Sequence, residues 1–123
     1  MSPDDISELF RVFGAVDVRR MFGGAGIFAD DMMIGLVHDG VIYLKCDEQT
    51  EPAFERESLG PFTYRRKGKL ASLNYRRMPD RLYDDPDELA AWAREALGAA
   101  RRHRAKSKRP GGRKSAARAK KSR

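Results

Sequence analysis

Residues 32–46 read MMIGLVHDGVIYLKC, two apolar runs joined by Asp39-Gly40. An Asp-Gly pair between such runs is a strong signal of a two-residue hairpin turn, because both turn residues need a positive φ. In the second run alternate residues share one face of a strand, with Ile42, Leu44 and Cys46 on the same side. The stretch therefore predicts two antiparallel strands and decides the class of fold.

A third strand is expected upstream of this hairpin, from Val16 to Ala29. It contains the run Gly23-Gly24-Ala25-Gly26, and Asp30-Asp31 predicts the turn into the next strand. The glycine run has neither the Gly-Lys-Ser/Thr ending of a phosphate loop nor the spacing of a dinucleotide-binding fingerprint. We therefore predict that it permits a bulge or a close approach of two backbone segments. A small-ligand site centred on the glycines is the alternative.

Two further strands are expected downstream, at 62–66 and 70–77, around a turn at Lys67-Gly68-Lys69. Between the two groups of strands, Asp47 predicts the cap of a helix over about 48–58. Pro52 weakens this prediction, because proline fits a helix only in its first turn.

The chain is expected to begin and end its folded part with helices. Ser2 and Pro3 are typical of a helix start, and so are Asp85 and Pro86. Trp92 is expected to anchor the last helix on the sheet. The fold class is therefore α+β, with an antiparallel sheet of about five strands in the order α-β-β-β-α-β-β-α and helices packed on the sheet.

Charge is divided unevenly along the chain. The 25 basic and 18 acidic residues give a net charge of +7, but residues 101–123 hold twelve basic residues and no acidic one. Subtracting these twelve leaves 13 basic against 18 acidic residues, a net charge of −5 for residues 1–100. The C-terminal segment also lacks large apolar residues, so it cannot offset the entropy of ordering. We predict one domain over 1–100 and a disordered tail over 101–123, whose first residues prolong the last helix.

Few residues are suited to catalysis or metal binding. Cys46 is the only cysteine, and His38 and His103 are the only histidines. Cys46 is predicted to be a buried, inert thiol, and His38 an exposed turn residue. We expect no enzyme, no cofactor and no metal site. Without a membrane span or a secretion signal, the protein is expected to be cytoplasmic, and association with the nucleoid is compatible with its charge.

Two basic regions are candidate nucleic-acid sites. Flexible polycations bind polyanions by releasing counterions, without recognising sequence. The predicted tail site consists of Arg101, Arg102, Arg104, Lys106, Lys108, Arg109, Arg113, Lys114, Arg118, Lys120, Lys121 and Arg123. A second candidate is the hairpin with Arg65, Arg66, Lys67, Lys69, Arg76 and Arg77, interleaved with Tyr64 and Tyr75. Basic residues at that hairpin are also explained by protection of a sheet edge against aggregation.

Four segments resemble the N-terminal domain of the TfoX/Sxy family. They are Arg20 to Phe28 with its glycine run, Leu44-Lys45 before Asp47-Glu48, Pro61-Phe62-Thr63-Tyr64, and the helix start from Asp85 to Ala93. The resemblance covers nearly all of residues 5–100. It implies a compact α+β unit without established catalytic residues, in a family associated with regulation of DNA-transformation competence. Two-domain members of the family continue with a helical domain, whereas a basic tail follows here.

The leading hypothesis is a non-enzymatic regulatory or accessory protein. Its tail would hold it on nucleic acid, most simply DNA, while its body binds a partner protein or a second copy. In the alternative, the body is a partner-protein or ligand-binding module, and the tail aids solubility or contacts RNA or acidic proteins.

Overall fold

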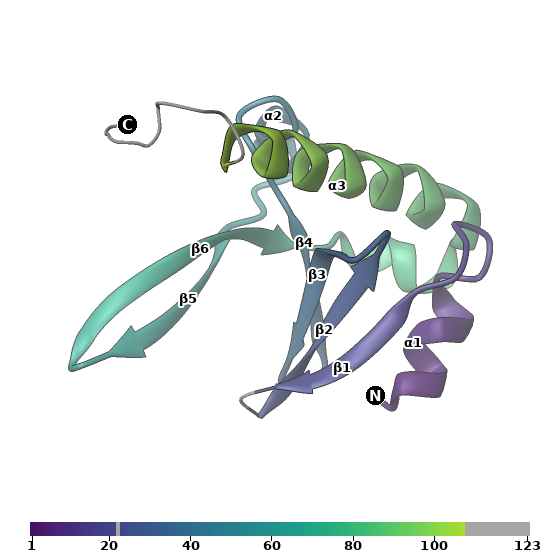
Figure 1. Ribbon diagram of the computed structural model, residues 1–123, viewed down its shortest axis with the longest axis horizontal. Coiled ribbons are helices and arrows are strands. Elements are labelled where there is room, and N and C mark those ends of the chain that lie inside the picture. Colours follow the sequence, from purple (N-terminus) through teal and green to yellow (C-terminus); the bar gives the residue numbers. More distant parts are fainter. Residues whose placement is uncertain (22, 108–123) are drawn as a thin grey trace.

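A six-stranded antiparallel sheet with helices on one face forms the body of the protein in the computed structural model, which describes residues 1–21 and 23–107 (Figure 1). The elements are α1 (Pro3–Leu9), β1 (Asp17–Met21), β2 (Gly24–Ala29), β3 (Met32–His38), β4 (Val41–Lys45), α2 (Glu51–Arg56), β5 (Pro61–Arg66), β6 (Lys69–Arg77), the 3-10 helix η1 (Asp80–Asp84) and α3 (Pro86–Ser107). The strands lie in the order β1-β2-β3-β4-β6-β5. The predicted α+β class is confirmed.

The sixth strand arises where one strand was predicted over residues 16–29. The chain instead reverses at the glycine run, so that β1 and β2 pair with Met21 opposite Gly24. Gly23 has a φ of +78°, a conformation that glycine adopts without steric cost. The reversal was not predicted because the glycine run was interpreted as a bulge or close approach within one strand.

The other strands turn where the sequence predicts. Asp30 and Asp31 have φ angles of 51° and 62°, and Asp39 and Gly40 have 53° and 73°. Lys67 and Gly68 also have positive φ angles, of 52° and 79°. Positive φ at both central residues matches the right-handed twist of the flanking strands, so these turns also set the strand register.

Capping side chains begin two of the helices as predicted. The Ser2 hydroxyl accepts a hydrogen bond from the Asp5 N–H, and the Asp5 carboxylate accepts one from the Ser2 N–H. At α3 the Asp85 carboxylate accepts a hydrogen bond from the Glu88 N–H. The prediction for the second helix was wrong in its start, because Asp47 closes a separate turn by accepting from the Thr50 N–H. α2 begins only at Glu51, which places its proline in the first turn.

All three α-helices pack on the same face of the sheet. Ile6 and Phe10 from the N-terminal helical region, Phe54 from α2 and Leu89 from α3 belong to one core with buried residues of β2, β3 and β4. The core face of α3 is otherwise built from alanines, which allow the helix to lie close to the sheet: Ala93, Ala96 and Ala100. None of the helices within the described residues is long and apolar enough to cross a membrane.

Trp92 packs against the core at the side of α3 and also contacts the short helix α2. Its ring meets Phe54 of α2 edge to face, with the ring centroids 5.1 Å apart. The indole Nε1 donates to the Glu88 carboxylate at 3.4 Å. The prediction that Trp92 anchors α3 did not include this contact with α2, which joins two helices.

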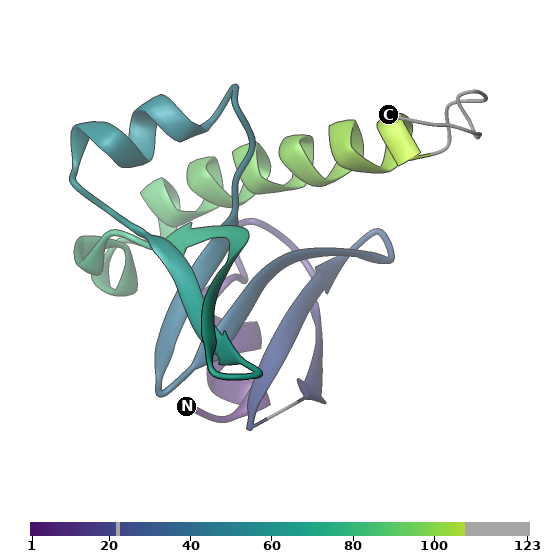
Figure 2. The same ribbon diagram turned by 90° about the vertical axis from the view of Figure 1, so that its left-hand side faces the viewer.

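The strands β5 and β6 form an arm (residues 61–77) that leaves the sheet. Only Tyr75 to Arg77 of β6 pair with β4, whereas the remainder of β6 pairs with β5 alone. The pairing within the arm shifts register between Pro61 and Thr63, and such irregularities bend a strand. Figure 1 and Figure 2 show the arm projecting away from the helices.

Candidate nucleic-acid interface

The first cations of the predicted tail lie on α3 and are tied to the body. Arg102 makes a two-pronged ion pair with Asp47, with Nε–Oδ2 and Nη2–Oδ1 distances of 2.6 and 3.1 Å. Arg101 pairs with Asp30 at 2.8 Å, and Lys106 with Glu48 at 3.0 Å. The prediction of disorder from residue 101 is therefore corrected for these residues, because α3 continues to Ser107 and its side chains find carboxylates.

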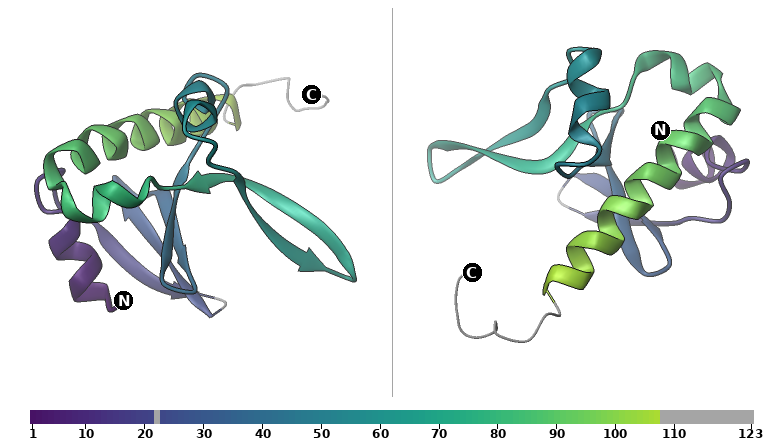
Figure 3. Two further views of the ribbon diagram at one scale, coloured as in Figure 1. Left: turned by 180° about the vertical axis from the view of Figure 1, so that it is seen from behind. Right: turned by 90° about the horizontal axis from the view of Figure 1, so that it is seen from above.

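Of the remaining nine predicted tail residues, the structure describes one, Arg104. Among the residues that the structure describes, Arg104 has no carboxylate within ion-pair distance. Figure 3 shows the C-terminal end of α3 reaching past the sheet. Eight predicted residues lie outside the described residues: Lys108, Arg109, Arg113, Lys114, Arg118, Lys120, Lys121 and Arg123.

The predicted basic hairpin does not form one patch. Four of its cations, Arg65, Arg66, Lys67 and Lys69, gather at the tip of the arm. Arg76 lies at the base, where its side chain is 14% exposed and pairs with Glu51 and Glu55 of α2. The neighbouring Arg77 pairs with Asp80 at 3.4 Å. The structure thus separates a cationic tip from two arginines already engaged by carboxylates.

The two tyrosines of the hairpin have different surroundings. Tyr75 is buried, its hydroxyl donates to the Met33 carbonyl at 3.4 Å, and the Lys45 ammonium lies 4.9 Å from its ring centroid. Burial raises the pKa of Tyr75 to about 12. Tyr64 is half-buried and lines an open cleft. Of the two tyrosines, Tyr64 is therefore the more exposed.

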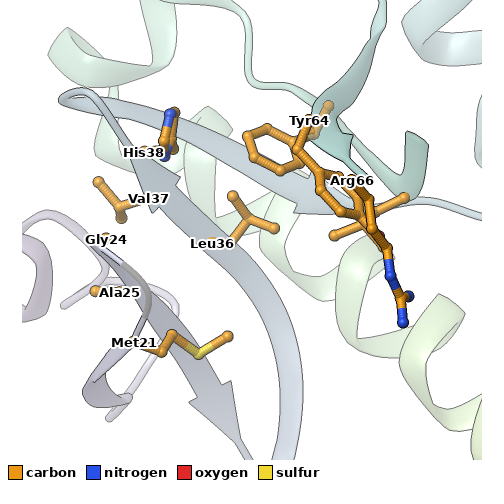
Figure 4. A pocket seen from close by; sticks show the side chains of 10 residues that line it. Met21, Gly24, Ala25, Leu36, Val37, His38, Tyr64 and Arg66 are labelled. Atoms are coloured by element: carbon orange, nitrogen blue, oxygen red, sulfur yellow. The ribbon is translucent and has the colours of Figure 1, made fainter. Parts of the chain in front are cut away.

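This cleft lies between the arm and the sheet and has a volume of about 660 Å³ (Figure 4). The cleft could not be predicted from the sequence, since its walls come together only through the bend of the arm. The alternation of Phe62, Tyr64 and Arg66 on one face of β5 was the available signal. Its principal lining residues come from four strands: Met21, Leu36, Phe62, Tyr64, Arg66 and Leu73.

The glycine run lies at one side of the cleft, and its predicted structural role is confirmed. A Cβ atom on Gly24 would stand 2.0 Å from the Val37 carbonyl oxygen. A Cβ atom on Gly26 would meet the Phe28 ring at 2.8 Å and the Met21 sulfur at 3.0 Å. Gly24 is required because a backbone carbonyl occupies the space of a side chain, whereas at Gly26 the Phe28 and Met21 side chains would have to move.

The single cysteine has the environment of an inert thiol. Cys46 is buried in the core beside Ile42 and Leu44, as predicted. Burial raises the pKa of its thiol, so that the nucleophilic thiolate is disfavoured. Within residues 1–21 and 23–107, no three His, Cys, Asp or Glu side chains are arranged to hold a metal ion.

The two histidines lie at different places. His38 is exposed, as predicted, and its ring meets Phe62 edge to face at the border of the cleft, with centroids 5.4 Å apart. His103 lies on α3, where burial, together with the charges of Lys45 and Lys106, lowers its pKa. Neither arrangement pairs a histidine with a nucleophile.

Comparison with known proteins identifies relatives over most of the body. The family model of the TfoX N-terminal domain matches residues 8–100. The DNA transformation protein TfoX1 of Aliivibrio fischeri is 31% identical over 84 residues, which cover 68% of this chain and 40% of that protein. Protein Sxy of Escherichia coli K12 is 28% identical over 93 residues, which cover 76% of this chain and 44% of that protein. The chain thus spans about two fifths of the length of these curated relatives.

Proposed function

Because the chain belongs to the TfoX N-terminal domain family, we propose that it is a non-enzymatic regulatory or accessory protein that associates with nucleic acid through its basic C-terminal segment. One relative is named a DNA transformation protein, and we extend a role in DNA-transformation competence to this chain. DNA is the proposed nucleic acid, bound without sequence preference. The body is proposed to hold a partner protein or a second copy.

The uneven distribution of charge carries this proposal. Residues 101–123 hold twelve basic residues and no acidic one, while residues 1–100 have a net charge of −5. An acidic body repels DNA, whereas a run of cations attracts it and releases bound counterions. The described part of this segment continues α3 to Ser107, and among its cations Arg104 pairs with none of the described carboxylates.

The ion pairs at the end of α3 limit how many cations are available. Arg101, Arg102 and Lys106 already contact carboxylates, so nine of the twelve basic residues remain. If about six of these meet phosphates, the logarithm of affinity for duplex DNA should fall with the logarithm of salt concentration with a slope of about −5.

The test replaces the eight basic residues of 108–123 by glutamine in the full chain and measures duplex binding across a salt gradient. Most of the salt dependence should disappear. The matched control exchanges lysine and arginine among the same eight positions, which preserves charge and should preserve the slope. An unchanged slope in the glutamine variant would exclude binding through the tail.

The same measurement distinguishes nucleic acid from an acidic protein. Polyglutamate and RNA are compared with duplex DNA at equal charge concentration. The proposal expects DNA to be retained at least as strongly as polyglutamate, because the density of charge on the duplex supplies more counterions for release. Stronger retention of polyglutamate would identify an acidic protein as the partner.

A further inference from the structure

One face of the sheet carries no helix in the part of the chain that the structure describes. The core residues Ile27 and Leu44 point toward the helices, so their strand neighbours point to the opposite, open face. Strand pairing aligns one row of residues across that face: Arg19, Gly26, Leu36, Tyr43 and Arg77. Apolar and cationic side chains therefore share the open face.

The sheet is basic although the body as a whole is acidic. The six strands contain eight lysines and arginines and a single acidic residue, Asp17, within the described residues. Asp17 lies at the far edge of the sheet and pairs with Arg19 at 2.8 Å. The body's carboxylates otherwise lie in helices and turns. An anionic ligand can therefore approach the open face without repulsion from its strands.

Aromatic rings line one wall of the cleft on this face. Phe62 meets Tyr43 edge to face, with centroids 4.9 Å apart, and lies nearly parallel to Tyr64, at 18° and 6.2 Å. The opposite wall is aliphatic, with Leu36 and Met21 pointing toward the arm in Figure 4. The cleft is thus lined mainly by apolar side chains, and the half-buried Tyr64 forms part of one wall.

Cationic side chains lie at the opening of the cleft. Arg66 lines the cleft and lies directly opposite Lys69 on the adjacent strand, so both side chains occupy the same face of the arm. None of the carboxylates that the structure describes pairs with Arg66. Lys67 follows in the turn. Cationic side chains next to a cleft with aromatic residues suit an extended polyanion that also carries aromatic bases.

We propose that this cleft binds an unpaired base of single-stranded nucleic acid, with Tyr64 as the stacking surface and Arg66 and Lys69 on the adjoining phosphates. Base stacking on aromatic rings together with a cationic groove is the general chemistry of single-strand binding. A duplex does not expose the face of a base, so it would meet only the cations. The cleft and the tail are thus both proposed to bind nucleic acid, but through different residues.

Other occupants fit the cleft less well. The segment 108–123 contains no large apolar residue, so it has nothing to fill an apolar cleft. A second copy placed arm to arm would bring Arg66 and Lys69 against the same cations, which opposes association. A single-stranded polyanion suits both the apolar cleft and the cationic side chains at its opening.

The first test measures binding of a short labelled oligothymidine, and of a duplex of similar length, to the full chain. Tyr64→Ala should weaken oligothymidine binding roughly five- to hundredfold, which is the effect of removing one stacking ring. Its binding to the duplex should stay unchanged. Tyr64→Phe retains the ring and should restore binding, while Thr63→Ala, on the other face of the same strand, should have no effect.

The second test uses two adjacent arginines as a matched pair. Arg66 lines the cleft, whereas Arg65 points to the opposite face of the same strand. Arg66→Gln should weaken oligothymidine binding several-fold more than Arg65→Gln, although both remove one charge. Equal losses of oligothymidine binding in the two variants would show that the tip of the arm contributes only charge, and would overturn the proposal.

Two further outcomes would also overturn it. One is an equal loss of oligothymidine and duplex binding in Tyr64→Ala, because stacking requires an unpaired base. The other is a change in the oligomeric state of that variant by light scattering, which would make the cleft an interface between copies. The tail proposal is judged separately, since its glutamine variant should alter the salt slope and leave the preference for single strands intact.

Discussion

Two neighbouring rows of residues run across the same sheet and face opposite sides of it. In one row Ile27, Gly35 and Leu44 are buried under the helices. In the next row Gly26, Leu36 and Tyr43 lie on the face that no described helix covers. Both rows contain large apolar side chains. The difference shows that apolar character along a strand does not reveal which face becomes the core, because helix docking decides it.

The largest expected effect contrasts the same substitution on the two faces. Leu44 is 0% exposed in the core, whereas Leu73 at the cleft is 39% exposed. Leu44→Ala should lower the free energy of unfolding by about 2–5 kcal/mol through lost burial and a cavity. Leu73→Ala should cost about 1 kcal/mol or less, since part of its side chain already contacts water. Urea denaturation measures both, and equal losses would contradict the assignment of faces.

The next effect concerns the backbone beside the cleft. Gly24→Ala should destabilise the protein by about 2–3 kcal/mol, because its Cβ would stand 2.0 Å from the Val37 oxygen and strand β3 must move. Gly60 is the matched control, with no atom within 4 Å of its added Cβ. Gly60→Ala should change stability by no more than about 1 kcal/mol. A thermal melt of both variants tests whether the glycine run is needed for close approach.

A smaller effect separates two arginines at the end of α3. Arg102 is partly buried and pairs with Asp47, so Arg102→Ala should cost about 1 kcal/mol. Arg104→Ala should leave stability nearly unchanged. Amide hydrogen exchange of residues 101–107 should increase in the Arg102 variant alone. Equal exchange in the two variants would show that the ion pair does not hold the helix end.

The smallest expected effect on the free energy of unfolding comes from mildly acidic pH. The Arg102 guanidinium holds the pKa of Asp47 below its ordinary value of 3.8, and Arg81 lowers the pKa values of Glu57 and Glu88 below 4.5. The unfolded chain therefore takes up protons first as the pH falls. Stability should be constant above about pH 5, where these groups are ionised in both states, and should decline through pH 4 and below. Urea midpoints at several pH values measure this, and Arg102→Ala should weaken the decline.

Local chemistry explains which parts of the fold could be predicted. The Asp39-Gly40 turn and the Ser2 cap involve only residues close in sequence, and both were predicted in place. The reversal at Gly23 was missed, because the glycine run was interpreted as a bulge or close approach within one strand and not as a turn. The placement of Trp92 against Phe54 was missed as well, since the two residues belong to helices separated by the arm.

The candidate sites divide in the same way. The basic segment after residue 100 is visible in the sequence, because a run of cations needs no partner to be recognised. The pairing of Arg101, Arg102 and Lys106 with carboxylates joins residues more than fifty positions apart and was not predictable. Tyr64 and Tyr75 looked equivalent in the sequence, yet one is buried and the other lines the cleft.

The amino-acid sequence by itself determined the α+β class, the positions of the tight turns and the concentration of positive charge at the C-terminal end. Each of these depends on residues near one another in the chain. Only the tertiary structure decided which face of the sheet the helices cover, which cations are neutralised and where the cleft opens. Those outcomes depend on contacts between distant segments, which the bend of the arm and the length of α3 bring about.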